Sequence, residues 1–268
     1  MTYERHPSAA NTNALVSPQY VTHPGSSVDA LVSPQYQTTP SGETSPLIIL
    51  GAALVAWWRA DLGITLNGSN VSAWADQSGN GWHLTQGTAV NQPAFSASGG
   101  PNSQAMVNFD GTNDVLPNAA LARPAPGTEP SLIFLILRQD VYANRRFCGA
   151  GVSNTLNIHQ SALDPQIRML NAANGPTNSA LVVGAWGRII GFFNNNTTDY
   201  LKIIATTVTG TNCGNNTGVG FCLGANSPGS VEADCSIAEA FIANRDLTAP
   251  EATALDAYVT SRYGAGLV

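Results

Sequence analysis

The sequence has little charge of either sign. Charged residues make up 10% of its 268 positions, against about 25% in a typical soluble protein. Lys202 is the only lysine beside ten arginines, the net charge is −6, and no basic run occurs. A protein that binds nucleic acid needs a basic surface to neutralise phosphates, so we expect no nucleic-acid partner.

Long apolar runs are also absent. The strongest, residues 47–58, has about a dozen positions, whereas a membrane-spanning helix needs roughly twenty. We interpret it as the end of a linker followed by a buried strand, and we expect no membrane insertion. Residues 1–7 lack the basic and apolar segments of a secretory leader, which predicts synthesis in a cytoplasm without export by a standard leader.

Cysteine is scarce and irregularly spaced. The four cysteines are Cys148, Cys213, Cys222 and Cys235. None belongs to a CxxC pair, which argues against a zinc site. Two interpretations stay open: Cys213 and Cys222 face each other across a hairpin, or all four are free thiols, as in a reducing cytoplasm.

A duplicated heptapeptide marks the N-terminal part of the chain. Ala-Leu-Val-Ser-Pro-Gln-Tyr occurs at residues 14–20 and again at 30–36. Two copies this short bury no core of their own, so we interpret residues 1–46 as an extended anchoring arm with two docking segments. The alternative is a recent duplication in a disordered tail. The expected docking residues are Leu15, Val16, Pro18, Tyr20, Leu31, Val32, Pro34 and Tyr36.

Residues 47–268 have the pattern of an all-β domain. Short apolar segments alternate with clusters of Gly, Asn and Pro, as in a β-sandwich. The predicted strands are 54–59, 105–109, 132–138, 146–148, 156–159, 166–170, 179–183, 188–193, 200–207, 219–223 and 236–243.

One helix is predicted near the C-terminus. Thr248 and Glu251 form a capping box with a proline in the first turn, and Gly264 supplies the C-cap. The helical spacing of Leu255, Tyr258 and Val259 indicates that these side chains pack on the sandwich.

Four motifs resemble the concanavalin A-like, or laminin G-like, jelly-roll family. They are Leu-Val-Ala-Trp-Trp-Arg-Ala-Asp at 54–61, Trp-Ala-Asp-Gln-Ser-Gly-Asn-Gly at 74–81, Asn-Phe-Asp-Gly-Thr-Asn-Asp at 108–114 and Ile-Ala-Glu-Ala-Phe-Ile-Ala-Asn-Arg at 237–245. The resemblance implies a two-sheet antiparallel jelly-roll sandwich with one C-terminal helix, carried on the extended N-terminal arm. This fold hosts lectins, glycosidases and virion proteins alike, so the resemblance leaves the activity open.

The sequence offers no clear pair of catalytic carboxylates. The family's retaining glucanases use an E-x-D-x-x-E strand, which places two carboxylates across the bond to be cut. The nearest approach is Glu232, Asp234 and Glu239, where the spacing is too long and alternation puts the two glutamates on opposite faces. Glu239 fits a structural hydrogen-bonding role better. We therefore predict no catalytic residue and no enzymatic activity.

Calcium is the only metal that the sequence brings into consideration, and no other cofactor is expected. Asp76, Asp110 and Asp114 are loop oxygens of the kind that calcium prefers. Asp76 and Asp110 also fit as turn caps, because their carboxylates can accept backbone N–H bonds near Ser78 and Thr112.

A sugar site needs an aromatic ring for the apolar sugar face and amide or carboxylate partners beside it. Trp82, Tyr142 and Trp186 are the candidate glycan-binding residues, and Asn-rich loops supply amides. The alternative is that these rings are packing residues, since a tryptophan or tyrosine often has an apolar body and one polar end.

Together these features resemble bacteriophage virion accessory proteins. We predict a non-enzymatic head decoration, fibre or tail-appendage protein, made in the host cytoplasm and located in the virion. Its arm would dock on a capsid or other virion protein, with avidity from two segments, and its jelly roll would meet a host-surface glycan. A homo-oligomer is expected on a repeated particle surface. The alternatives are a secreted or cell-surface carbohydrate-binding module and a divergent glycoside hydrolase.

Overall fold

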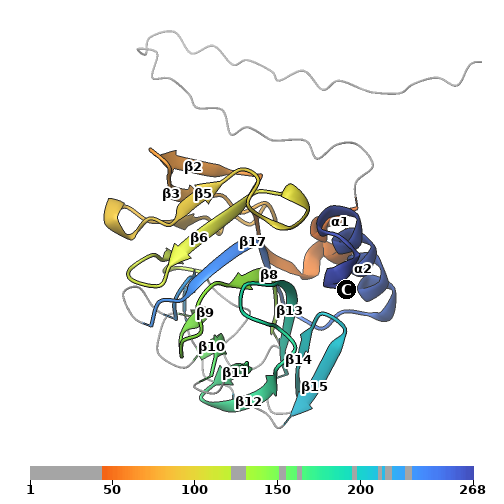
Figure 1. Ribbon diagram of the computed structural model, residues 1–268. Helices are drawn as coiled ribbons and strands as arrows, with labels where there is room; N and C mark the ends of the chain where they lie inside the picture. Colours follow the sequence, from red (N-terminus) through yellow and green to blue (C-terminus); the bar gives the residue numbers. More distant parts are fainter. Residues whose placement is uncertain are drawn as a thin grey trace, which may run out of the picture. The chain divides into compact units, whose positions relative to one another are not determined.

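A computed structural model shows two antiparallel β-sheets and a C-terminal helix, which confirms the predicted all-β sandwich (Figure 1). The structure describes residues 44–121, 131–150, 155–161, 165–194, 198–210, 213–214, 219–226 and 231–268. The docking residues expected in the two heptapeptides lie outside the described residues, so the anchoring arm stays a prediction.

The larger sheet, sheet A, contains both the first and the last strand of the domain. Its strands are β1 (Leu54–Arg59), β2 (Ile64–Asn67), β3 (Asn70–Trp74), β4 (Leu84–Thr85), β5 (Ala94–Ser96), β6 (Met106–Asp110), β8 (Ser131–Gln139), β13 (Trp186–Phe193), β14 (Asp199–Ile203), β15 (Thr206–Gly210) and β17 (Asp234–Ala243). They run in the order β15-β14-β13-β8-β17-β6-β5-β3-β2, with β1 paired to β17 and β4 to β3.

The smaller sheet, sheet B, is built from the middle of the chain. Its strands are β7 (Leu116–Asn118), β9 (Arg146–Ala150), β10 (Thr155–Gln160), β11 (Ile167–Asn171), β12 (Ala173–Asn178) and β16 (Phe221–Leu223). They run in the order β12-β11-β10-β9-β16-β7.

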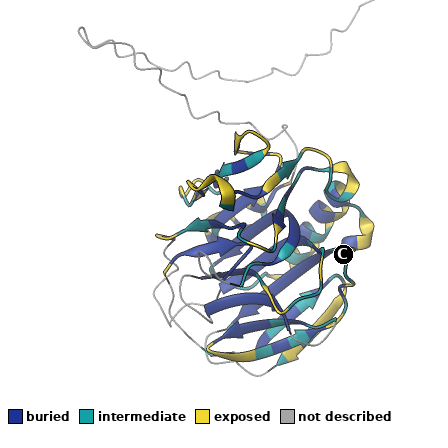
Figure 2. Cartoon of the chain, turned by 60° about the vertical axis from the view of Figure 1, so that its left-hand side comes forward, coloured by how far each residue is buried: buried dark blue, intermediate teal, exposed yellow. Residues whose placement is uncertain are grey.

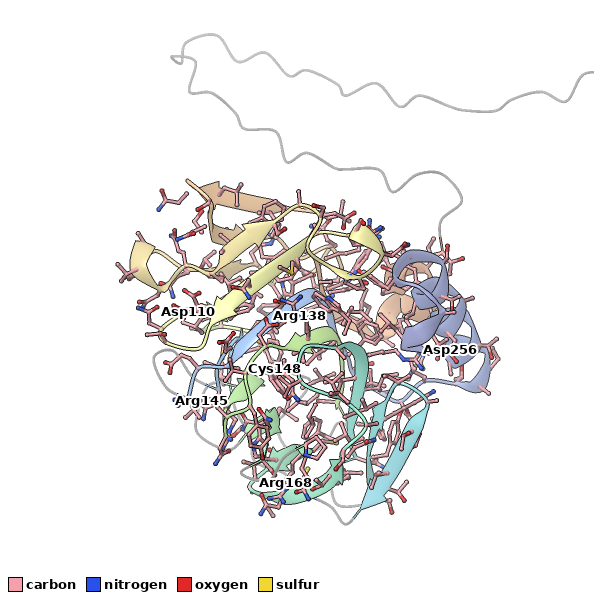
Figure 3. The ribbon with its side chains drawn as sticks, in the orientation of Figure 1. Asp110, Arg138, Arg145, Cys148, Arg168 and Asp256 are labelled. Atoms are coloured by element: carbon pink, nitrogen blue, oxygen red, sulfur yellow. The ribbon has the colours of Figure 1, made fainter. Side chains whose placement is uncertain are left out.

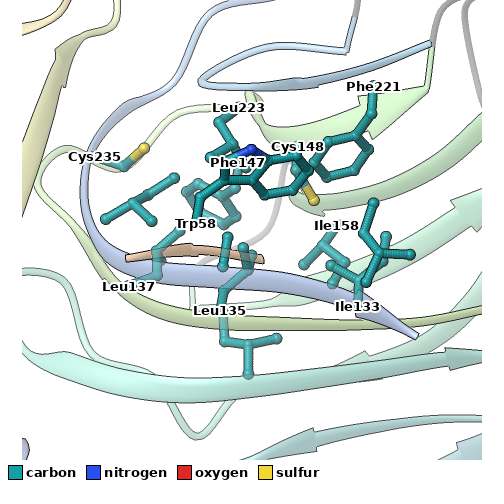
Figure 4. Close-up of a cluster of buried hydrophobic side chains, with 14 of the residues drawn as sticks. Trp58, Ile133, Leu135, Leu137, Phe147, Cys148, Ile158, Phe221, Leu223 and Cys235 are labelled. Carbon is teal, nitrogen blue, oxygen red and sulfur yellow. The ribbon is translucent and has the colours of Figure 1, made fainter. Parts of the chain in front are cut away.

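Strand β8 contributes side chains to two hydrophobic cores, one on each face of sheet A. Every residue of β8 except Arg138 is buried. Because successive side chains point to opposite faces, Ile133 and Leu135 enter the core shared with sheet B, whereas Phe134 and Ile136 enter a second core on the outer face of sheet A. Figure 4 shows part of the first core, and Figure 2 shows how fully the central strands are buried.

Helix α2 (Ala249–Tyr263) covers the second core. The predicted capping box is present: the Thr248 side chain accepts the Glu251 N–H, and the Glu251 side chain accepts the Thr248 N–H. Gly264, at φ 99°, ends the helix as predicted. The buried residues of α2 are Leu255, Tyr258, Val259 and Tyr263.

The remaining helical segments are short. They are α1 (Pro46–Leu50), η1 (Gly51–Ala53), η2 (Ala89–Asn91), η3 (Pro101–Ser103) and η4 (Ala265–Leu267). The segment expected to be the end of a linker is therefore helix α1, and strand β1 follows it as predicted. None of the helices in the described ranges is long and apolar enough to cross a membrane.

Two strand predictions are wrong. Residues 179–183 form no strand; β12 precedes them and includes the expected turn at residues 174–176. Strand β12 lies at an edge of sheet B, where Pro176 costs no ladder hydrogen bond. Residues 200–207 form two strands, because the chain turns at Ile204 with φ 52°.

The cysteines form no disulfide. All four are buried free thiols, so Cys213 and Cys222 do not pair across a hairpin. Burial raises the pKa of Cys148 to about 12, which keeps this thiol protonated and unreactive.

Glu239 connects helix α2 to sheet A. Its side chain is fully buried and accepts hydrogen bonds from Trp57 Nε1 at 2.5 Å, from Tyr258 Oη at 2.9 Å and from Tyr263 Oη at 2.7 Å. Burial raises the pKa of the Glu239 carboxyl. This arrangement confirms the structural role expected for Glu239.

We predict that Glu239→Ala destabilises the domain by about 3 kcal/mol or more, because it leaves several buried donors without an acceptor. Tyr258→Phe, which removes one donor, is the matched control and should cost about 1 kcal/mol. The free energy of unfolding is measured by urea denaturation of the full chain. Equal losses for both variants would contradict a shared role for Glu239.

Candidate functional site

Three polar side chains form a row across the middle of sheet B. His159 of β10 is the Cα partner of Arg146 on β9 and of Arg168 on β11. Directly paired residues share a face of the sheet. Ile158 and Met169, the next paired residues, point into the core between the sheets. The row therefore lies on the outer face of sheet B.

Two polar neighbours compete for one ring nitrogen of His159. Arg146 Nη1 lies 2.7 Å from His159 Nδ1, and Gln160 O lies 3.1 Å from the same atom. An arginine only donates and a carbonyl only accepts, so the two neighbours favour opposite tautomers of the ring. Burial, followed by the charge of Arg146, lowers the pKa of His159 to about 3. The imidazole is thus neutral.

Several polar atoms around this row are buried without a hydrogen-bond partner. They are Arg146 Nε, both side-chain polar atoms of Asn157 and His159 Nε2. Asn157 is 0% exposed and His159 is 5% exposed. A buried polar group without a partner costs on the order of 1–3 kcal/mol, so these four atoms make the row a candidate contact for a polar ligand.

Gly149 makes room for one of these groups. A Cβ atom on Gly149 would lie 2.1 Å from Asn157 Oδ1, so only glycine allows the carboxamide to lie over β9. Leu156, immediately before Asn157, has φ 45°, an uncommon conformation for a branched side chain. Strained backbone of this kind concentrates at functional sites.

The predicted glycan-binding residues do not come together. Tyr142 lies beside the end of β10, where its hydroxyl donates to Ser161 O at 3.4 Å. Trp82 packs against the core between the sheets. Trp186 packs against the core under α2, with the Arg138 guanidinium 5.3 Å from its ring. Only Tyr142 is near the row on sheet B.

The aspartates predicted for calcium cap turns. Asp76 accepts from Ser78 N–H at 2.9 Å and also from Trp82 N–H, while Asp110 accepts from Thr112 N–H at 2.8 Å. These bonds confirm the capping alternative. Within the described ranges, no group of three or more His, Cys, Asp or Glu side chains could hold a metal ion, so the calcium site gains no support.

A second polar row crosses the outer face of sheet A. Trp186, Arg138, Ser236 and Asn108 are paired across β13, β8, β17 and β6. Asp140 accepts hydrogen bonds from the three polar members of this row.

Two carboxylates lie beside this second row. Asp234 and Asp110 are direct partners on β17 and β6, which places their Cβ atoms about 5 Å apart. Burial, followed by the charges of Asp140 and Asp110, raises the pKa of Asp234. A carboxyl with a raised pKa beside a second carboxyl is the pair that glycoside hydrolysis uses.

A hollow of about 210 Å³ lies beside α2 on the outer face of sheet A. Its two carboxylates are already engaged, because Asp246 accepts from Tyr200 Oη at 2.5 Å and Asp256 pairs with Arg188. The side chain of Lys202 also lines it. None of the residues that line this hollow has a buried polar atom without a partner, although Nε of Arg188, which pairs with Asp256, is such an atom.

No family model and no curated protein matches the sequence. Solved structures do match. A Trypanosoma rangeli sialidase in complex with sialic acid gives a TM-score of 0.54 at 14% identity, over 78% of this chain and 33% of its own. An arabinofuranosidase complexed with arabinofuranosyl-alpha-1,2-xylobiose gives 0.55 at 16%, over 74% and 51%. A GH54 arabinofuranosidase soaked with a cyclic sulfate inhibitor gives 0.56 at 16%, over 82% and 60%.

These comparisons define a β-sandwich with the fold found within glycosidases. The chain spans between 33% and 60% of the length of these enzymes, and at such identities the likeness shows the fold alone. The comparisons correct two predictions. A non-enzymatic virion accessory protein and the absence of enzymatic activity were expected, but the matching structures are glycosidases, which favour the carbohydrate-binding and hydrolase alternatives.

The sequence did not reveal the polar rows. Arg146, His159 and Arg168 are 13 and 9 residues apart along the chain, and only strand pairing brings them together. The one available signal was a single polar or charged residue at position 146, 159 or 168 of three predicted strands that also contain apolar residues.

Asp114 gives a pH prediction. It accepts the Asp110 N–H at 3.0 Å, and burial raises its pKa to about 6, above the value near 4 of an unfolded chain. The folded protein therefore binds this proton more tightly, so the stabilisation is present below about pH 4 and is lost as the pH rises through 6.

Asp114→Asn keeps the acceptor and removes the titration. We expect the variant to gain stability relative to the parent between pH 4 and pH 7, by on the order of 1–2 kcal/mol. Urea denaturation at intervals of one pH unit measures the gain. Parallel stability curves for the two proteins would contradict the raised pKa.

Proposed function

We propose that this β-sandwich is a carbohydrate-binding domain and that the outer face of sheet B, between β9 and β11, holds the sugar. The observation that carries the proposal is the group of buried, unpartnered polar atoms around His159. A sugar supplies many hydroxyls, each a donor and an acceptor, and would satisfy such groups. The glycosidases that share the fold support this class of ligand.

Different side chains of this face would contact different parts of the sugar. The Asn157 carboxamide offers a donor and an acceptor to a pair of hydroxyls. His159 Nε2 offers a further polar atom to a hydroxyl. Tyr142, at the end of β10, presents a ring on which the apolar face of a sugar packs.

Binding is tested with the full chain on a glycan array that includes arabinoxylan oligosaccharides and sialyllactose, followed by calorimetry on the bound sugars. We predict that Asn157→Ala and His159→Gln each weaken binding about tenfold or more, because buried hydrogen bonds to ligand are lost. Asn67→Ala, on the exposed edge strand β2, is the matched control.

Stability separates a binding role from a folding role. Because the Asn157 side chain has no partner, Asn157→Ala should leave the urea midpoint unchanged within error or raise it. No bound glycan on the array, or full affinity in both variants, would contradict the proposal.

Hydrolysis is the second candidate function, and the pair formed by Asp110 and Asp234 favours it. Asp234, with its raised pKa, would protonate the leaving oxygen, and Asp110 would act as nucleophile, since directly paired strand residues have the short separation of retaining enzymes. Trp186 and Arg138 lie in the adjacent row.

We predict that any release of reducing sugar by the chain falls at least about 100-fold in Asp234→Asn, because the proton donor is lost. Glycan binding on sheet B should stay unchanged in this variant. Reducing-end assays on the array-positive sugars measure the release, with Asp61→Asn as the control. Equal turnover in Asp234→Asn and the parent would contradict this role.

A further inference from the structure

Three directly paired side chains form part of the floor of the hollow beside helix α2. They are Ile190, Lys202 and Thr207, which are Cα partners across β13, β14 and β15 and line the hollow. Leu201 and Ile203, the neighbours of Lys202 on β14, belong to the core between the sheets. Alternation therefore places the floor on the outer face of sheet A, away from the polar row on sheet B.

Two bridges between the sheet and the segments above it fix the wall of the hollow. Tyr200 Oη donates to Asp246 Oδ1 at 2.5 Å, and the buried Arg188 of β13 pairs with Asp256 of α2. Figure 3 labels Asp256 on the side of the helix that faces the sheet. Because these bridges hold α2 in place without a ligand, the hollow is already formed, and binding needs no rearrangement of the helix.

The charges around the hollow cancel. Lys202 contributes an ammonium and Asp246 and Asp256 contribute carboxylates, while Arg188 lies behind Asp256 as its partner. Two positive and two negative side chains leave no excess of either sign, so neither an anion nor a cation is favoured. The bonds from Tyr200 and Arg188 use Oδ1 of each carboxylate, so Oδ2 of each carboxylate takes part in neither bond.

The size and the remaining side chains of the hollow favour a polar ring with one apolar face. Its volume is about 210 Å³, against about 150 Å³ for a cavity that binds benzene, so a six-membered ring fits. Thr207 and Thr209 offer hydroxyls beside Lys202. The apolar side chains that line the hollow are Ile190, Leu247, Ala252 and Leu255. A pyranose has C–H groups for such side chains and hydroxyls that both donate and accept.

We infer that this hollow is a second carbohydrate site, which binds a single neutral monosaccharide unit of a glycan. The inference rests on the proposed carbohydrate-binding function and adds a site on the other sheet from His159. Lys202 donates to one sugar hydroxyl, and Asp246 and Asp256 accept from others through Oδ2. With both sites occupied, one domain binds two glycan chains, which increases its avidity for a surface that carries many copies of a glycan.

The site is tested by calorimetry on the full chain with the methyl glycosides of galactose, glucose and mannose. We expect at least one of them to bind with a Kd on the order of 1 mM. Ala252→Trp, whose ring fills the hollow, should weaken this binding at least about tenfold. Ala257→Trp, at an exposed position of the same helix, is the matched control and should bind like the parent, as should Asn157→Ala on sheet B.

The ligand class is tested with the uronate and the 2-amino form of each hexose. We expect the neutral glycoside to bind at least about fivefold more tightly than either charged form, because the charges around the hollow cancel. Thr209→Val, which removes one hydroxyl from edge strand β15, should weaken binding about threefold or more, since one hydrogen bond to the ligand is lost. This variant keeps the test valid if Ala252→Trp does not fold.

The outcomes separate this inference from the proposed function. Glycan binding that is lost in Asn157→Ala and kept in Ala252→Trp would overturn the second site and leave the site on sheet B in place. Tighter binding of a charged form, or of leucine as a zwitterion in place of any glycoside, would overturn the neutral sugar even if Ala252→Trp abolished it. Absence of all binding, to the glycosides and to the glycan array, would overturn both proposals.

Discussion

The buried carboxylate of Glu239 is the constraint on which the arrangement of the domain depends. It sits on β17, the strand that pairs with β8 on one side and with β1 and β6 on the other, so its hydrogen bonds to Tyr258 and Tyr263 tie helix α2 to the centre of sheet A. A carboxylate taken out of water is stable only with several donors around it. Helix α2 supplies them, and the apolar outer face of sheet A is thereby covered.

Because helix α2 covers that part of sheet A, the two polar rows and the hollow beside the helix are the parts of the sheets that remain for binding or catalysis. Glu239 and the row on sheet B both contain buried polar groups, but these groups differ in their hydrogen-bond partners. At Glu239 each oxygen has donors from the chain, and the arrangement serves stability. Around His159, the two side-chain polar atoms of Asn157 and the Nε2 atom of His159 have none, and the chain adds strain at Leu156. Buried unpartnered groups and backbone strain lower stability, and such features are typical of a binding site.

The sequence predicted those parts of the fold that depend on local pattern. Strand β1, the capping box at Thr248 and the turn caps at Asp76 follow from short-range chemistry, and the structure has them as expected. Edge strand β12 was missed because Asn174 to Pro176 reads as a turn, and only sheet pairing makes it a strand. The polar row on sheet B was missed for the same reason, since it is a property of register between strands and not of any one segment.

The two candidate sites lie on different faces of the sandwich, so their activities are separable. Cys235 and Ile237 point into the core between the sheets, and alternation therefore places Asp234 and Ser236 on the outer face of sheet A. The row around His159 is on the outer face of sheet B. The backbone joins the two faces at the rim, where Arg146 N–H donates to Val231 O and Asp140 N–H donates to Asp234 O. A sugar chain bound on sheet B would thus reach the carboxylates of sheet A only by passing around this rim. Binding on sheet B therefore does not depend on those carboxylates.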